Sequence, residues 1–362
     1  MTKDMHKESW DEATRTKLDI FEQYIHEWLN IVLSIDANKD IEIYDLFCGS
    51  GYDGTKTCKG SPLRILDCLM KRNLKDKKIK IFFNDIEKSK IDELKEIIDK
   101  SHEYQKLINK SIEIKYTHVD AKKYEIHSKT YFKFIYLDQY GLEYIMDLEK
   151  FIKRGHDILI FISSSFLKRF IEEDGFKEIK NFLCLSKKDF KDKNNYKTHQ
   201  IITEACKKKF IKYYICPFTL LKSDNINVNG LIFISNNAKG QEQFLKAAWS
   251  IDPLNGEGNI DVDKNYDKVI GSLFHNPNTK TTKLINYENN LKEFLSDFRT
   301  NIDIKGFGMN HGFLTKHTKS ILEEIKNVLE YKYENGSQRG FHLDNRDIKV
   351  KIKIKNKINE TK

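Results

Sequence analysis

The stretch IEIYDLFCGSG, residues 41 to 51, decides the fold of this chain. It opens with a short run of β-branched and aromatic residues, Ile41 to Phe47, which is typical of a buried parallel strand. The run ends in Cys-Gly-Ser-Gly, where Gly49 and Gly51 let the backbone turn sharply and approach a ligand closely. The stretch therefore predicts a strand that ends in a ligand-binding bend.

Strand and helix patterns alternate on both sides of this stretch. Amphipathic spacing predicts a helix over residues 14–35 that covers the sheet. Further strands are predicted at 78–84, 112–119, 132–137 and 157–163, and helices at 61–71, 89–100 and 148–153. Ser61 is the predicted N-cap of the first of these helices, with Pro62 in its first turn. This alternation predicts an α/β fold with a doubly wound, mostly parallel, Rossmann-like sheet.

The pattern is weaker after residue 163. Helices are predicted at 166–183 and 241–249, a mobile polar loop at 186–200, and strands at 210–221 and 229–234. The two strands suit the antiparallel edge that such sheets often carry. Residues 1–250 are thus predicted to form one Rossmann domain.

Helix-breaking residues then mark a boundary. Prolines and glycines between Asp252 and Thr282 predict a linker or irregular segment over 251–285. Helices predicted at 287–298 and 316–331 follow, and then a strand at 348–355 in which Val and Ile alternate with Lys. This layout resembles a small, basic, winged-helix-like module over 286–362.

Positive charge is concentrated in two segments. The chain carries a net charge of +9: residues 186–222 contribute +7, residues 346–362 contribute +5, and the remaining residues sum to −3. Localised positive charge is what a polyanion-binding face requires, so it favours nucleic acid, DNA or RNA, as a partner over a merely solvated surface.

The same composition favours a cytoplasmic protein. No apolar run is long enough to cross a bilayer, and the charged N-terminus lacks the apolar core of a secretion signal. The six cysteines form no CxxC pair, which argues against a zinc site and against a disulfide framework.

Four carboxylates close four successive predicted strands: Asp45, Asp85, Asp120 and Asp138. Because parallel strands end at one edge of the sheet, these acids can grip a single ligand. Asp45 suits an amine or a bound water, Asp85 the ribose hydroxyls of an adenosine, and Asp120 with the backbone of Ala121 an adenine ring. Together with Phe47, Gly49, Ser50 and Gly51 of the bend, they predict a site for S-adenosylmethionine (SAM) in a methyltransferase-type Rossmann domain.

A dinucleotide is the alternative cofactor, because Gly49, Gly51 and Gly54 match GxGxxG. In a dinucleotide site, however, the third glycine opens a helix, whereas helix signals begin here only at Ser61. Asp85 also lies later than the ribose-binding acid of that motif, which is expected about 20 residues on.

The loop after the strand at 132–137 indicates the reaction. Amino-methylating enzymes of nucleic acids resemble one another in an Asp/Asn-Pro-Pro-aromatic loop, which orients an exocyclic amine and stacks on a flipped base. Here the loop is Asp138-Gln139-Tyr140-Gly141, so Asp138 and Tyr140 are the predicted catalytic residues. No Pro-Cys loop is present to attack a pyrimidine carbon.

The chain resembles the three-Cys-motif partner proteins, which accompany a radical-SAM-like three-Cys-motif protein. The resemblance covers most of residues 14–250 and rests on these blocks: Tyr24 with Trp28, DLFCGSG, GSPLRIL at 60–66, FNDIEKS at 83–89, YLDQYG at 136–141, GLIFISNN at 230–237, and Trp249. It implies a SAM-type fold, a three-Cys-motif partner protein, and a link to nucleic-acid modification or mobile-element defence.

These patterns predict a SAM-dependent methyltransferase that acts on nucleic acid. A non-catalytic subunit that binds nucleic acid and assists a three-Cys-motif protein is the alternative from another class. A nuclease is a weaker alternative, because His199, His311 and His317 are isolated in the sequence.

Overall fold

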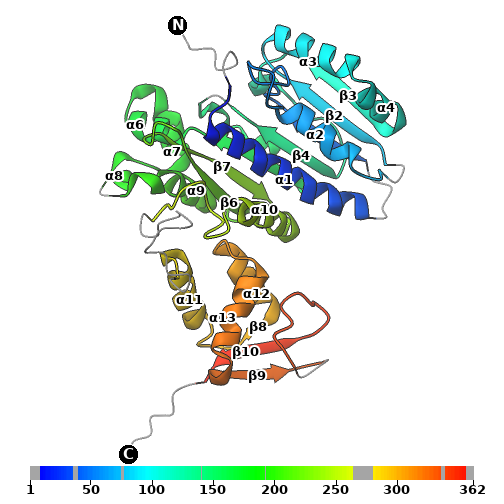
Figure 1. Cartoon of the computed structure of the whole chain (residues 1–362). Coiled ribbons are helices and arrows are strands. Elements are labelled where there is room, and N and C mark those ends of the chain that lie inside the picture. Colours follow the sequence, from blue (N-terminus) through cyan, green and yellow to red (C-terminus); the bar gives the residue numbers. More distant parts are fainter. Residues whose placement is uncertain are drawn as a thin grey trace, which may run out of the picture. The chain divides into compact units, whose positions relative to one another are not determined.

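The computed structural model describes residues 9–35, 40–74, 77–139, 141–191, 193–263, 280–335 and 339–355. The chain forms two compact units (Figure 1). The first comprises Met1–Ile251 and Glu257–Val262, and the second comprises Asp252–Gly256 and Asp263–Lys362. None of the described helices is both long and apolar enough to span a bilayer.

Within the described residues, the first unit contains a seven-stranded sheet with the order β3-β2-β1-β4-β5-β7-β6. Its strands are β1 Ile41–Asp45, β2 Ile79–Asn84, β3 Ile112–Thr117, β4 Phe132–Leu137, β5 His156–Ile162, β6 Tyr214–Leu221 and β7 Val228–Ser235. Strands β1 to β5 pair in parallel, whereas β7 runs antiparallel to both β5 and β6. The predicted doubly wound, mostly parallel sheet with an antiparallel edge is therefore confirmed.

Helices cover both faces of this sheet. They are α1 Glu12–Ser34, α2 Ser61–Met70, α3 Lys88–Lys100, α4 His102–Ser111, α5 Leu148–Phe151, α6 Ser164–Phe170, α7 Lys177–Leu183, α8 Lys187–Phe190, α9 Thr198–Lys209 and α10 Ala238–Ile251. On one face, the ring of Phe21 in α1 lies 4.4 Å from that of Tyr136. On the other face, Ile135 and Ile160 belong to a core that also contains Ile202 of α9. The fold is thus a three-layer α/β arrangement.

Residues 186–200 differ from the prediction. In place of a mobile loop, the described part of this segment contains α8 and the start of α9. Ser186 and Asp189 form a reciprocal capping box at α8, and Phe190 is buried. Helix α9 buries His199 and two threonines, so its packed face is partly polar and gives no apolar periodicity in the sequence.

The second unit combines helices with a small antiparallel sheet (Figure 1). Its elements are α11 Thr282–Phe294, β8 Arg299–Thr300, α12 Asn301–Asn310, α13 Thr315–Glu324, β9 Leu329–Tyr333 and β10 Val350–Ile354. In its described part the strand order is β8-β10-β9, with both pairings antiparallel. The predicted helix over 316–331 was wrong at its end, because Leu329 already belongs to β9. Val350 and Ile352 are buried, as the alternation in this strand predicted.

Candidate cofactor site

The glycine bend after β1 is fixed by hydrogen bonds. Gly49 and Gly51 have φ angles of +62° and +95°, in the left-handed region that favours glycine, and Ser50 between them is half-buried. The amide of Cys48 donates to the last carbonyl oxygen of β2 (2.9 Å), and the amide of Gly49 donates to Oδ2 of Asp85 (3.1 Å). The bend is therefore held against the end of β2.

Residues 51–60 return the chain from the bend to α2. The amide of Gly60 donates to the carbonyl oxygen of Gly51 at 2.7 Å, which closes this loop. Gly60 is also the N-cap of α2, so the prediction of Ser61 as the N-cap was wrong by one residue. The Ser61 hydroxyl instead donates to Oδ2 of Asp45 at 2.6 Å, which joins the start of α2 to the end of β1.

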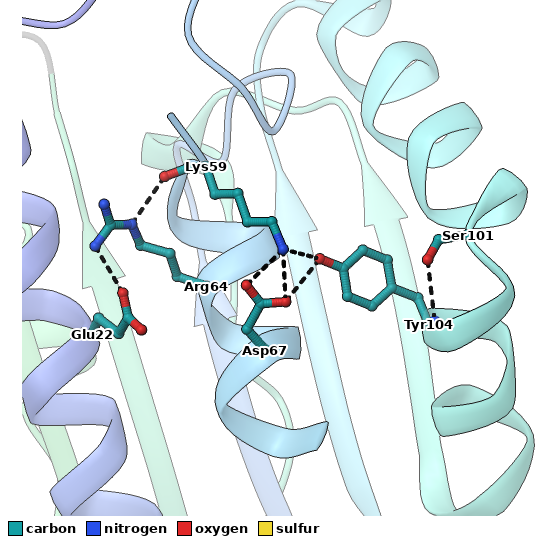
Figure 2. A network of polar contacts seen from close by, with 6 residues as sticks. All are labelled: Glu22, Lys59, Arg64, Asp67, Ser101 and Tyr104. Carbon is teal, nitrogen blue, oxygen red and sulfur yellow. Dashed lines mark hydrogen bonds and ion pairs between the residues drawn. The ribbon is translucent and has the colours of Figure 1, made fainter. Parts of the chain in front are cut away.

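Ionic contacts anchor this return loop to its neighbours (Figure 2). Nζ of Lys59 contacts the two carboxylate oxygens of Asp67 at 3.0 and 2.8 Å and the hydroxyl of Tyr104 at 3.1 Å. Nε of Arg64 donates to the carbonyl oxygen of Lys59 at 2.9 Å, and its Nη1 contacts Glu22 at 2.8 Å. Helices α1, α2 and α4 are thereby joined at the loop.

Asp45, the last residue of β1, is completely buried. Its second oxygen accepts the amide of Phe47 at 3.3 Å. The pKa of Asp45 is raised to about 7, chiefly by burial; the hydrogen bonds from Ser61 and Phe47 oppose the rise, and the nearby carboxylates of Asp138 and Asp85 contribute to it. Asp45 is paired in register with Phe83 of β2 and Tyr136 of β4, so Asp85 and Asp138 lie two residues beyond its partners at the same edge of the sheet.

Asp85 follows β2 and is also buried. Besides Gly49, it accepts the amide of Glu87 at 2.9 Å through Oδ1. Each carboxylate oxygen has a second lone pair, so ribose hydroxyls can still donate to Asp85. The next residue, Ile86, is 66% exposed, and Val119 beyond β3 is 42% exposed. Exposed apolar side chains beside these strand ends suit a planar base.

Asn84 is a structural residue of the site that the sequence analysis missed. Its side-chain nitrogen donates to the carbonyl oxygens of Leu46 (3.2 Å) and Val119 (2.9 Å). Its side-chain oxygen accepts the amide of Val119 (3.1 Å) and the hydroxyl of Thr117 (2.8 Å). One buried amide therefore ties together the carboxyl ends of β1, β2 and β3.

Asp120 lies at the β3 end of the site and caps a short 3-10 turn that begins with the buried Ala121. Its Oδ1 accepts the amide of Lys122 (2.9 Å) and the hydroxyl of Tyr144 (3.1 Å), and both bonds lower the pKa of Asp120. The Tyr144 ring stands edge-on to that of Phe47, with centroids 4.9 Å apart. Tyr144, which the sequence did not reveal, therefore links the predicted adenine-binding residues to the bend.

Asp138 follows β4 and pairs with Lys17 of α1. Nζ of Lys17 lies 2.7 Å from Oδ1 and 2.6 Å from Oδ2 of Asp138, and 4.7 Å from the centre of the Phe161 ring. A predicted catalytic carboxylate is thus held in an ion pair that the sequence analysis did not foresee. Tyr140, the other predicted catalytic residue, lies outside the described residues.

Gln139 fixes the turn that follows. It is buried, its nitrogen donates to the carbonyl oxygen of Phe161 (3.0 Å), and its oxygen accepts the amide of Tyr144 (2.9 Å). Gln139 therefore has a structural role, joining β4 to β5 and to the Tyr144 turn.

His199 has a structural role and not that of a nuclease residue. It is fully buried, with Nδ1 2.8 Å from Oγ of Ser164 and Nε2 3.0 Å from the carbonyl oxygen of Leu231. Burial lowers the pKa of His199 to about 4, so the ring is neutral at physiological pH. Within the described ranges, no three His, Cys, Asp or Glu side chains are grouped to hold a metal ion.

The strand order, the reversed β7 and the bend after β1 define a Rossmann-like sheet of the methyltransferase type. Helix α2 begins at Ser61, well beyond Gly54, which disfavours the dinucleotide alternative. No family model matches the chain, and no curated protein matches its sequence.

Among the solved structures that match the chain at low similarity, three are methyltransferases or a SAM complex. Trm1 from Pyrococcus horikoshii, in complex with SAM, matches 63% of this chain with 11% identity and a TM-score of 0.31, and the chain spans 58% of that protein. The O-methyltransferase TomG from Streptomyces achromogenes, in complex with SAM, matches 63% of this chain and 91% of its own, with 9% identity and a TM-score of 0.32. Loganic acid methyltransferase with SAH matches 99% of both chains, with 11% identity and a TM-score of 0.33.

Proposed function

We propose that this chain is a SAM-dependent methyltransferase. The observation that carries the proposal is the convergence of Asp45, Asp85 and Asp138 beside the glycine bend at one edge of the sheet. A cationic ligand is favoured there because, among these three carboxylates, Asp138 alone forms an ion pair within the described residues. SAM carries a sulfonium and an ammonium group, and it would supply an electrophilic methyl group.

The residues around the bend fit the remainder of SAM. Asp85 has lone pairs for the ribose hydroxyls, and Asp120 with Ala121 lies at the next strand end, where the adenine would follow. Ile86 and Val119 offer exposed apolar surface for the adenine plane. Phe47, Gly49, Ser50 and Gly51 form the bend against which the ligand would lie.

Calorimetric titration of the full chain with SAM tests this proposal. We expect a saturable heat with a Kd in the micromolar range. A folded sample that gives no heat at high micromolar SAM would contradict the assignment, whatever its activity.

We expect SAM affinity to rise between pH 6 and pH 8. The pKa of Asp45 is raised to about 7, so this carboxyl is mostly neutral at pH 6 and mostly ionised at pH 8. The ionised form attracts the cationic ligand. We expect the affinity for SAM to rise several-fold over this range, with a limiting slope of about tenfold for each pH unit below the pKa. Calorimetry across this pH range measures it. Asp45→Asn is the control: it should bind more weakly and lose this pH dependence, and an unchanged profile would rule Asp45 out as the cause.

We further propose that nucleic acid is the acceptor and that it binds the second unit. The order of helices and strands from α11 to β10, with β10 between β8 and β9, is that expected of a winged-helix module. On the sheet face opposite Val350 and Ile352, Lys351 lies directly across from Lys332. The ring of Phe298 has Nζ of Lys332 at 4.0 Å and Nζ of Lys353 at 4.8 Å. Cations around an aromatic ring suit phosphates and bases.

Replacing Lys332, Lys351 and Lys353 together by alanine is expected to weaken nucleic-acid binding at least tenfold at moderate salt. The slope of log affinity against log salt should fall by up to about 3 units, since each lost phosphate contact removes nearly one. Fluorescence anisotropy with labelled duplex DNA and with RNA measures both quantities. The matched control replaces three exposed lysines of the first unit, Lys95, Lys100 and Lys106, and removes the same charge. Equal losses in the two variants would indicate a nonspecific charge effect.

The ion pair of Asp138 and the structural role of Gln139 favour one alternative, a non-catalytic subunit that binds nucleic acid and assists a three-Cys-motif protein, as in mobile-element defence. Incubation with SAM labelled in its methyl group separates the two functions. A methyltransferase transfers the label to DNA or RNA, which mass spectrometry of nucleosides locates. A subunit of the second kind binds SAM and nucleic acid without transferring it.

A further inference from the structure

The ion pair between Lys17 and Asp138 is a distinct feature of the site. A single ammonium group contacts both oxygens of the carboxylate, and the two side chains keep 12% and 20% of their surface exposed. The pair is therefore partly desolvated but still within reach of a ligand.

Attachment of α1 to the sheet does not require this pair. Phe21 already packs on Tyr136 at 4.4 Å, and Tyr24 packs on Phe134 at 5.4 Å. Lys17 lies one helical turn before Phe21, about 6 Å along α1, and Asp138 lies two residues beyond Tyr136, about 7 Å along the strand. The helix thus places its lysine over the end of β4. Removing two opposite charges from water is costly, so an apolar pair would attach the helix equally well.

The pair also lies at a defined end of the proposed cofactor site. The strand order is β3-β2-β1-β4, so Asp120 and Asp138 are separated by three strand spacings, roughly 14 Å. With the nucleoside at β2 and β3, the methionine part of SAM extends past β1 toward β4. That part ends in an ammonium and a carboxylate group, which together form a zwitterion.

We propose that Lys17 and Asp138 form the receptor for this zwitterion, an inference that rests on the proposed SAM-binding function. Asp138 takes the α-ammonium group and Lys17 takes the α-carboxylate. Each protein charge exchanges its present partner for one of the same sign on the ligand, so no charge is left unpaired. Asp138, which the sequence predicted to position the methyl acceptor, is thereby assigned to cofactor binding.

Calorimetry with two ligands tests the proposal: S-adenosylhomocysteine, which keeps the zwitterion, and 5′-methylthioadenosine, which lacks it. The wild-type chain should bind S-adenosylhomocysteine at least tenfold more tightly. Lys17→Met and Asp138→Asn should each lower this preference about tenfold or more, the value of a charge-assisted hydrogen bond, and leave binding of 5′-methylthioadenosine nearly unchanged. Lys17→Arg should retain the preference.

Lys207→Met is the matched control, because it breaks a lysine–carboxylate pair of the same unit on α9, where Nζ of Lys207 lies 2.7 Å from Glu204. It should leave the preference between the two ligands unchanged. Equal weakening of both ligands by Lys17→Met, or no weakening, would overturn the zwitterion receptor and leave a structural ion pair. A wild-type chain that binds neither ligand would instead contradict the SAM-binding function itself.

Discussion

Replacing Gly51 by valine is expected to lower the free energy of unfolding of the first unit by about 4 kcal/mol and to abolish measurable SAM binding. The φ angle of +95° is strained for any residue with a side chain, and most of all for a β-branched one. A Cβ atom at this position would also lie 2.9 Å from Cδ1 of Leu94, a side chain buried in the core. The bend would have to move away from α3, or the Leu94 side chain would have to shift. Denaturant unfolding and calorimetry with SAM measure the two effects.

The variant Gly141→Val measures the cost of backbone strain in the absence of a steric clash. Gly141 has a φ angle of +106°, but an added Cβ there would meet nothing within 4 Å. The cost should be limited to backbone strain, about 1–3 kcal/mol. If the two variants lose the same stability, contact with Leu94 contributes nothing and the close packing of the bend is not the cause.

Asn84→Leu is expected to destabilise the first unit by about 3 kcal/mol or more. The substitution keeps the branched shape and the number of side-chain heavy atoms but leaves buried groups of Leu46, Thr117 and Val119 without their partner. Because the same amide aligns three strand ends, SAM affinity should fall together with stability. Urea unfolding followed by circular dichroism gives the first quantity and calorimetry the second.

Thr117→Val provides a graded comparison, since it removes one of these hydrogen bonds and keeps the side-chain shape. Its expected cost is about 1 kcal/mol. An Asn84→Leu variant no less stable than Thr117→Val would show that the amide is not a shared tie between the strands.

The sequence predicted the sheet well because parallel buried strands leave a strong local pattern. Runs such as Ile158 to Ile162 are continuous and apolar, and they lie between helical segments. Helix α9 was missed because its buried side chains include Thr198, His199 and Thr203, which are satisfied by hydrogen bonds. The two threonines donate to backbone carbonyl oxygens three or four residues earlier, whereas His199 contacts Leu231, 32 residues away, and apolar periodicity records neither kind of contact.

The candidate site was predicted only in part for the same reason. The acids were identifiable because each follows a strand, and parallel strands end at a common edge. Lys17 contacts a residue 121 positions away, and Tyr144 contacts Asp120 from a different loop. Neither contact has a local signature, since it depends on how α1 and the turn after β4 pack. Asn84 lies in the segment FNDIEKS at 83–89, but nothing in that segment distinguishes an asparagine that joins three strand ends from an ordinary strand residue.

The contacts of Lys59 and Arg64 that secure residues 51–60 have a consequence for the kinetics of cofactor capture. Fixing a flexible backbone residue costs about 1–2 kcal/mol in conformational entropy, a penalty that a mobile ten-residue loop would impose on every binding event. Here the contacts with Asp67, Tyr104 and Glu22 already order the loop in the folded chain. Most of this conformational entropy is therefore lost on folding and not on ligand binding. Association should therefore be limited by diffusion and orientation rather than by loop closure, with affinity differences among ligands expressed in their dissociation rates.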